Sequence, residues 1–146
     1  MNAGRVLLIV ASIAMAGAVW GGLCVLGSPM HQRALRLDDQ RLSSLGFLSS
    51  NVHGYWERHH VLPDDISAMD VAARWKQDPV TGKPYVYEKL DNGSYHLCAM
   101  FALAYDGEGT GENRLPRYVP MGTGWQHPAG AHCFRFQAAS LDMPNG

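Results

Sequence analysis

A stretch without any charged residue dominates the first part of the chain, because nearly every side chain from Val6 to Leu26 is aliphatic or small. Coiled as an α-helix, this stretch would be roughly 31 Å long, which matches the hydrocarbon core of a bilayer. We therefore predict a transmembrane anchor at residues 6–27, preceded by a tail at residues 1–5. A cleaved signal peptide is the alternative, because residues 14–16 form a small-x-small cleavage signature. Apolarity continues well beyond that signature, which favours the uncleaved anchor.

Small residues recur every three or four positions within this apolar stretch. They are Ala14, Gly17, Ala18, Gly21 and Gly22. Small side chains allow two membrane helices to approach closely, so the spacing predicts a helix-packing face. The alternative is ordinary composition, because glycine and alanine are common in membrane helices.

The next segment has the period of an amphipathic helix. Ser28 is suited to cap its start, and Pro29 to occupy its first turn. Apolar residues then follow at spacings of three, four and seven, namely Leu35, Leu42, Leu45, Leu48, Val52, Tyr55 and Trp56. This stripe predicts a long core helix at residues 30–62. We expect the charged residues Asp38, Arg41, Glu57 and Arg58 to lie off the stripe.

The end of the long helix is marked by Leu62-Pro63. A short helix is expected to follow, capped by Asp64 or Asp65 and running through Trp75. The sequence DPVTGKP comes next, and its turn-forming residues predict a loop.

After this loop the apolar residues alternate with a period of two, which is typical of β-strands. Strands at 85–90 and 94–102 flank an Asn-Gly pair and predict a β-hairpin. If that pair forms a two-residue loop, Leu90 lies opposite Tyr95. The face expected toward the helix then carries Val86, Leu90, Tyr95, Leu97 and Phe101. The other face carries Tyr87, Lys89, His96 and Cys98.

The carboxyl-terminal part is expected to supply a third strand at residues 132–137, with Phe134 and Phe136 on one face. A loop rich in glycine and proline precedes it at 105–127, and a tail follows at 138–146. The elements together predict an α+β fold. In it, a transmembrane helix leads into a long amphipathic helix that packs on a small antiparallel sheet within residues 63–137.

Composition and motifs narrow the function. The chain has 146 residues and a net charge of −1, which argues against a basic nucleic-acid-binding protein. It contains no P-loop, dinucleotide fingerprint or Ser-His-Asp motif. We therefore expect a protein that is not an enzyme, has no catalytic residues and holds no cofactor.

The two cysteines outside the apolar stretch, Cys98 and Cys133, both fall on the expected outer face of the sheet. We predict a disulfide between them, which would place the domain in an oxidising compartment. A metal-binding pair and two buried thiols are the alternatives. The positive charges that follow the anchor point the other way, because Arg33, Arg36 and Arg41 favour a cytoplasmic domain by the positive-inside rule.

Two further groups of residues could bind a metal ion. His127 and His132 flank a turn and could converge with His96, although the ligand spacing of known motifs is absent. The alternative is that these histidines are structural or exposed. Oxygen side chains alternate at Asp106, Glu108 and Glu112, which is the kind of loop that calcium prefers. The alternative there is a solvated glycine-rich loop.

Several motifs carry a resemblance to known proteins: Leu62-Pro63, the sequence DPVTGKPYVY at Asp78–Tyr87, GSYHL at Gly93–Leu97 and HPAGAHCF at His127–Phe134. They resemble the soluble half of the type II secretion major pseudopilins, with their LP, DPxGxPYxY and GxYxL elements. They are still more similar to uncharacterised bacterial membrane-anchored proteins with DPxTGxPYxY, YxLC and HxxGxHCF segments. The resemblance covers roughly residues 35–136 and implies a pilin-like domain outside the inner membrane.

The resemblance does not extend to the prepilin-peptidase site of pseudopilins, which has a Glu shortly after the cleavage point, because here an apolar stretch follows Arg5. The calcium ligands of the major pseudopilins also have no residue-by-residue match here. We therefore expect a non-catalytic, single-pass envelope protein of the bacterial inner membrane, with a periplasmic domain that serves as an interaction or accessory subunit. Its expected partners are the membrane and another protein, and no nucleic acid. The alternatives are a minor pseudopilin and a small metal protein or enzyme that uses His96, His127, His132 and Tyr87.

Overall fold

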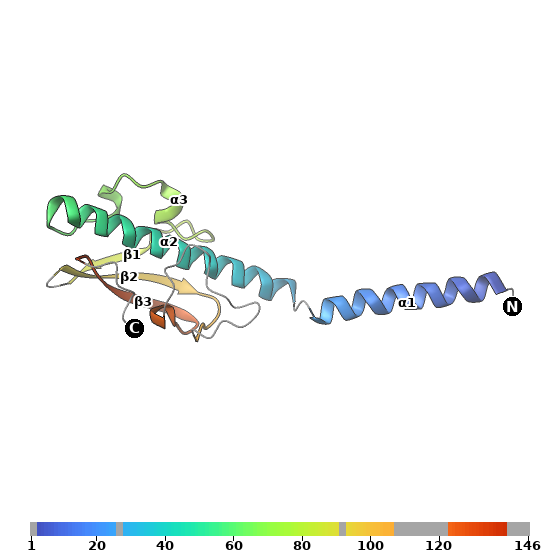
Figure 1. Ribbon diagram of the computed structural model, residues 1–146. Helices are drawn as coiled ribbons and strands as arrows, with labels where there is room; N and C mark the ends of the chain where they lie inside the picture. Colours follow the sequence, from blue (N-terminus) through green and yellow to red (C-terminus); the bar gives the residue numbers. More distant parts are fainter. Residues whose placement is uncertain (1–2, 26–27, 91–92, 107–122, 140–146) are drawn as a thin grey trace. The chain divides into compact units, whose positions relative to one another are not determined.

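Helices and one small antiparallel sheet make up the protein, which confirms the predicted α+β class (Figure 1). The computed structural model describes residues 3–25, 28–90, 93–106 and 123–139. The elements in chain order are α1 (Ala3–Val25), α2 (Pro29–His59), η1 (Ile66–Ala68), α3 (Ala73–Lys76), β1 (Val86–Lys89), β2 (Ser94–Phe101), η3 (Thr123–Trp125) and β3 (Gly130–Gln137). The chain divides into two compact units, Met1–Arg33 and Ala34–Gly146.

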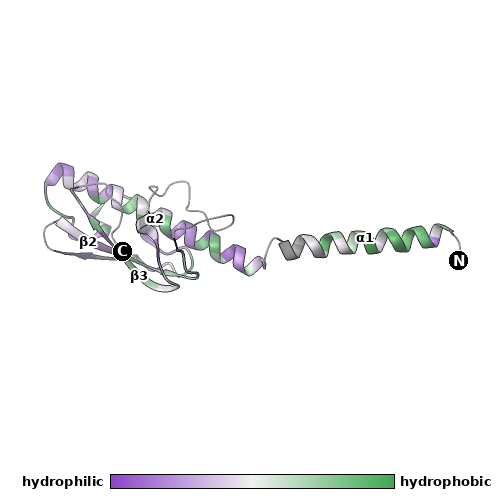
Figure 2. Ribbon diagram, turned by 60° about the horizontal axis from the view of Figure 1, so that its bottom comes forward, coloured by the Kyte–Doolittle hydropathy of each residue, from purple (hydrophilic) through white to green (hydrophobic). Residues whose placement is uncertain are grey.

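The first unit contains α1, the one helix of the described residues that is long and apolar enough to cross a membrane. Figure 2 shows that most of its described residues are hydrophobic. No side chain from Ala3 to Gly22 is buried by the described part of the chain, so the apolar side chains of this helix are exposed. The helix begins three residues before the predicted span, which places Arg5 in its first turn.

The long helix α2 begins where the sequence predicts. The Ser28 hydroxyl oxygen accepts a hydrogen bond from the His31 N–H at 3.2 Å, which is the expected cap. The helix ends at His59, three residues before the predicted end, because His60 takes the left-handed conformation with φ 55°. Leu62 precedes a proline, a position that disfavours the helical conformation.

The core lies between α2 and one face of the sheet (Figure 1). The predicted stripe is confirmed for five of its residues, which are buried, namely Leu35, Leu42, Leu45, Leu48 and Val52. Tyr55 and Trp56 are only half-buried. The sheet contributes Tyr95, Leu97, Phe101, Phe134 and Phe136. Trp125 of η3 is also fully buried, although the sequence pattern did not place it in the core.

The three strands have the order β1-β2-β3, with both pairs antiparallel. The predicted register of the hairpin is wrong by one residue, because Lys89 rather than Leu90 lies opposite Tyr95. The Leu90 N–H donates to the Ser94 carbonyl at 2.8 Å, so three residues separate this hydrogen-bonded pair. A three-residue loop with a left-handed glycine fits this connection, and Gly93 has φ 74°.

The shifted register exchanges the two faces of β1, since side chains alternate along a strand. Tyr87 and Lys89 lie on the face toward α2, and Val86 and Glu88 lie on the outer face. Tyr87 is therefore packed against the core, whereas Val86 is exposed. The faces of β2 and β3 are as predicted, with Phe134 and Phe136 buried.

The connecting segments also differ from the prediction. The expected short helix through Trp75 is two shorter pieces, η1 and α3, and Asp65 caps η1 by accepting from the Ser67 N–H at 2.6 Å. The predicted tail begins one residue too early, because Ala138 is fully buried. Its N–H donates to the Gly93 carbonyl at 2.9 Å, and its carbonyl accepts from His53 Nδ1 at 2.8 Å.

The close approach of Gly93 to Trp56 yields a testable prediction. An alanine there would have to adopt a left-handed backbone, which costs about 1–2 kcal/mol. Its Cβ would also lie 3.0 Å from the Trp56 ring. We expect Gly93→Ala to lower the free energy of unfolding by more than Gly82→Ala. Gly82 also has a positive φ, but an alanine Cβ there would have no atom within 4 Å. Urea unfolding of the full chain in detergent micelles measures both, and equal losses would contradict the contact with Trp56.

Candidate functional site

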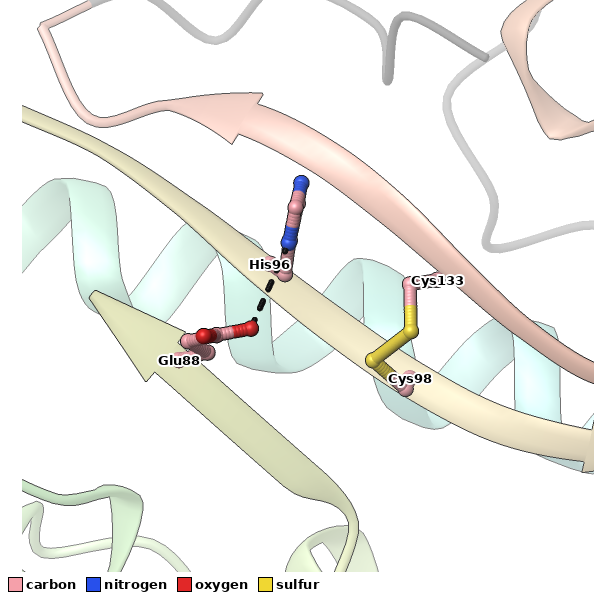
Figure 3. Close-up of a disulfide and its surroundings, with 4 residues drawn as sticks. All are labelled: Glu88, His96, Cys98 and Cys133. Carbon is pink, nitrogen blue, oxygen red and sulfur yellow. Dashed lines mark ion pairs between the residues drawn. A yellow bond between two sulfur atoms is a disulfide. The ribbon is translucent and has the colours of Figure 1, made fainter. Parts of the chain in front are cut away.

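The predicted disulfide is confirmed. Cys98 of β2 and Cys133 of β3 lie directly opposite each other in the register, and their sulfur atoms are 2.04 Å apart (Figure 3). Both side chains lie on the outer face of the sheet, away from α2, as the alternation of the strands predicts. Cys133 is exposed and Cys98 is half-buried. The bond therefore links the central strand to an edge strand on the surface that the core does not use.

Charged and apolar side chains surround the disulfide on this outer face. His96 lies two residues before Cys98, and its Nδ1 is 3.6 Å from Glu88 Oε2 of β1 (Figure 3). Arg135 lies opposite His96 on β3. The outer face therefore carries both signs of charge around the disulfide.

The three histidines considered as metal ligands do not meet. His96 points to the outer face, whereas His132 pairs with Ala99 and lies on the inner side of the sheet. His127 lies near His132, with 6.4 Å between the ring centroids. A sheet separates these two from His96, so the register rules out a common site for all three. Tyr87 donates to the Pro63 carbonyl at 3.1 Å and lies with the core.

The predicted calcium loop falls mostly on residues that the structure does not describe, since Glu108 and Glu112 lie outside the described ranges. Asp106 is described and exposed. Within the described ranges, no group of three or more His, Cys, Asp or Glu side chains is placed to hold a metal ion.

The small residues of α1 leave room for another helix. They are Ala14, Gly17, Ala18, Gly21 and Gly22, all of them exposed. A Cβ added at Gly17, Gly21 or Gly22 would meet no atom within 4 Å. The geometry is compatible with close packing of a second membrane helix, which the described chain does not itself supply.

Two hollows border α2 where it faces the segment that carries η1 and α3. The first has a volume of about 380 Å³ and is lined by Asp39, Gln40, Ser43, Ser44, Arg74, Trp75 and Pro79. The second has a volume of about 400 Å³ and is lined by Asn51, Tyr55, Arg58, His59, Ala68, Met69, Asp70 and Val71. Volumes of this size accommodate a few side chains of a partner or a small ligand.

An exposed aromatic residue of α2 comes between the two hollows in sequence. Phe47 is 40% exposed, and its ring lies 4.7 Å from that of Trp75. Arg74 lies over the Trp75 ring, 5.6 Å from its centroid. In the first hollow, burial and then the neighbouring Asp38 raise the pKa of Asp39. The hollows were not predicted, although an aromatic residue off the apolar stripe was the available signal.

A buried ionic network includes Asp38, the neighbour of Asp39 in the chain. Arg41 Nε donates to Asp78 Oδ2 at 2.6 Å, and Arg41 Nη1 donates to Asp38 Oδ1 at 2.7 Å. Asp38 also accepts from the N–H groups of Ala102 and Leu103, at 3.0 and 2.8 Å. We call Asp38, Arg41 and Asp78 the Asp-Arg-Asp network.

The loop that begins at Asp78 is built around its carboxylate, which accepts from the N–H groups of Val80 and Thr81 at 2.9 and 2.8 Å. Burial alone would raise the pKa of Asp78, but the hydrogen bonds from Arg41, Thr81 and Val80 outweigh it and lower the pKa to about 2. Burial likewise opposes the charge of Arg41, and its two carboxylate partners nevertheless raise its pKa.

The prediction that Asp38 and Arg41 lie off the buried stripe is wrong, because both are buried. The sequence contained a signal, since Asp38 comes three residues after Leu35 and four before Leu42. That spacing places it on the buried face of the helix. Charged residues are buried in proteins when they are paired. Asp78, the partner of Arg41, comes from a loop that is distant in sequence.

Comparison with protein-family models, with curated proteins and with solved structures yields no match. In the absence of a match, only the geometry of the described residues indicates what the protein can bind. They offer an apolar helix with a small-residue face, two hollows beside α2, and an outer sheet face with a disulfide.

The Asp-Arg-Asp network predicts a large effect of one substitution. Arg41→Met keeps the length of the side chain but leaves two buried carboxylates without a cation, which we expect to cost about 3–5 kcal/mol of unfolding free energy. Arg36→Met on the exposed side of the same helix is the control and should change little. Urea unfolding of the full chain in micelles compares them. An Arg41→Met protein as stable as the native one would refute the role of the network.

The disulfide predicts a second effect on stability. It closes a loop with a sequence separation of 35 residues, so Cys98→Ala/Cys133→Ala should lose about 4 kcal/mol in the chain-entropy model. Adding a thiol reductant should lower the stability of the native chain similarly. The double variant is the control, since reductant should leave it unchanged. A native chain that is insensitive to reduction in the same urea titration would contradict this contribution.

Proposed function

We propose that this chain is a non-catalytic, single-pass membrane protein whose disulfide-bonded α+β domain lies on the extracytoplasmic side of the bacterial inner membrane and binds a partner protein. The observation that carries the proposal is the combination of an apolar, uncovered α1 with a disulfide in the folded domain. An apolar helix of this length supports anchoring in a bilayer. A disulfide supports an oxidising compartment, since thiols are kept reduced in the cytosol.

The arginines that follow α1 are the main evidence for the opposite orientation, and the fold weakens that argument. Arg41 makes two hydrogen-bonded ion pairs inside the domain. The folded structure therefore requires Arg41 whichever side of the membrane the domain occupies. Arg33 and Arg36 remain as charges near the membrane end of α2.

Binding to another protein is supported by the surfaces that the domain exposes. Phe47 and the two hollows form an uneven surface along α2, with an aromatic residue available as an anchor. The small-residue face of α1 supports a second contact within the membrane. Both surfaces suit an accessory subunit of a membrane assembly.

Cysteine labelling tests the topology. We expect Ser67→Cys, at an exposed position of η1, to react with a membrane-impermeant maleimide in intact spheroplasts. The matched control, Ala3→Cys in the first turn of α1, should react only after lysis. The reverse pattern would overturn the extracytoplasmic placement.

Photocrosslinking tests the partner. A photoreactive phenylalanine analogue at Phe47 is expected to give a discrete adduct in cells, whereas the same analogue at Val80, which is also exposed, should not. Equal adducts at both positions, or none at Phe47, would count against the α2 surface as the binding site.

A minor pseudopilin is the second candidate. The order of an apolar helix, a long helix and a small antiparallel sheet favours it, as does the resemblance of the motifs. This candidate requires a prepilin peptidase to shorten the chain at its amino terminus. Intact mass spectrometry of the purified protein decides, because a mass equal to that of the full chain contradicts processing.

A further inference from the structure

Two imidazole rings are packed among aromatic residues where β2 ends and β3 begins. His127 is 5% exposed and stacks on Phe101, with 3.7 Å between the ring centroids. His132 packs edge-on against Phe134 at 4.7 Å. His127 also lies edge-on to Phe134, at 6.2 Å. This corner of the core is therefore aromatic and largely apolar.

The Nε2 atoms of both rings are buried and lack hydrogen-bond partners within the described ranges. His127 Nδ1 is 3.1 Å from the Pro128 carbonyl, which can only accept, so Nδ1 carries the proton in the neutral ring. Nε2 of His127 and Nε2 of His132 are buried and have no partner among the described residues. A proton added at either Nε2 would create an N–H without an acceptor and a positive charge in apolar surroundings.

Few charges of the described residues are placed to compensate for that proton. From α2, Asp38 faces His127, but its carboxylate is already engaged by Arg41 and by the N–H groups of residues 102 and 103. From the chain after β2, Tyr105 faces His127 with its ring. From β3, the charge of a protonated His132 would repel that of His127. Burial therefore lowers the pKa of both histidines, and the Pro128 carbonyl and Asp38 only partly offset this for His127.

A small backbone element depends on the same residue. The N–H of Tyr105 donates to the His127 carbonyl at 2.8 Å, and the N–H of His127 donates to the Tyr105 carbonyl at 2.9 Å. This Tyr105–His127 bridge joins the chain leaving β2 to the chain entering β3. The disulfide between Cys98 and Cys133 joins β2 to β3 at the register position next to the Ala99–His132 pair.

We propose that the His127–His132 pair is a pH-operated latch, in which protonation of the rings opens the Tyr105–His127 bridge while the disulfide-held sheet stays folded. At neutral pH both rings are neutral, and the bridge is closed. Below the ordinary pKa of histidine, the rings of the open form bind protons that the buried rings of the closed form do not. Opening therefore rises as the pH falls from about 6.5, by up to tenfold per pH unit for each histidine.

Site-resolved hydrogen exchange by NMR, on the full chain in detergent micelles, tests the latch. We expect the protection factors of the Tyr105 and His127 amides to fall about tenfold or more between pH 7 and pH 5. The Ala138 amide, which is hydrogen-bonded to the Gly93 carbonyl, reports on the other end of the sheet and should keep its protection. Constant protection at the bridge, or a parallel loss at Ala138, overturns the proposal.

Substitutions separate the histidines from other titrating groups. His127→Phe/His132→Phe keeps aromatic rings at both positions and should abolish the pH dependence of the bridge. His96→Gln, on the outer face, is the matched control and should leave it intact. If the double variant does not fold, NMR titration of the native imidazoles decides. A midpoint for His127 below 6.5 supports the latch, and one at or above 6.5 overturns it.

Discussion

The guanidinium of Arg41 joins three parts of the domain that are distant in sequence. It binds Asp38 within α2 and Asp78 at the start of the loop before β1. Asp38 in turn holds the N–H groups just beyond the end of β2. An apolar stripe alone would let a helix slide or rotate on a sheet with little change in buried area. Directional hydrogen bonds to a charged group do not tolerate such a shift, so the network determines where α2 lies along the sheet.

Much of the fold follows from periodicity, and its departures have physical causes. The stripe from Leu35 to Val52 was predictable because buried helix positions recur every three or four residues. The pairing of Cys98 with Cys133 was predictable because two strands place both on one face. The register of β1 was not, because it depends on whether the turn has two or three residues. That choice rests on the backbone of Gly93 and on its close approach to Trp56.

The candidate site was harder to predict than the fold. Arg41 looked like a surface charge because its partner Asp78 is 37 residues away, and pairing at that distance leaves no local pattern. His127 and His132 were considered as metal ligands or as structural or exposed histidines, and the structure packs both against aromatic rings. The hollows beside α2 are lined on their other side by residues from η1 through α3 to Pro79, where two short pieces replaced the helix expected there.

The hydrogen bond between His53 and Ala138 has a consequence for folding during synthesis. The two residues are 85 positions apart, and the strands that cover α2 follow it in the chain. While the chain is being synthesised, the apolar stripe of α2 has nothing to pack against until β2 and β3 have followed. Such non-local contacts make folding slower than that of a domain with mainly local contacts. The domain can therefore complete its core only after the residues up to Ala138 have been synthesised, and a chaperone would find α2 exposed in the interval.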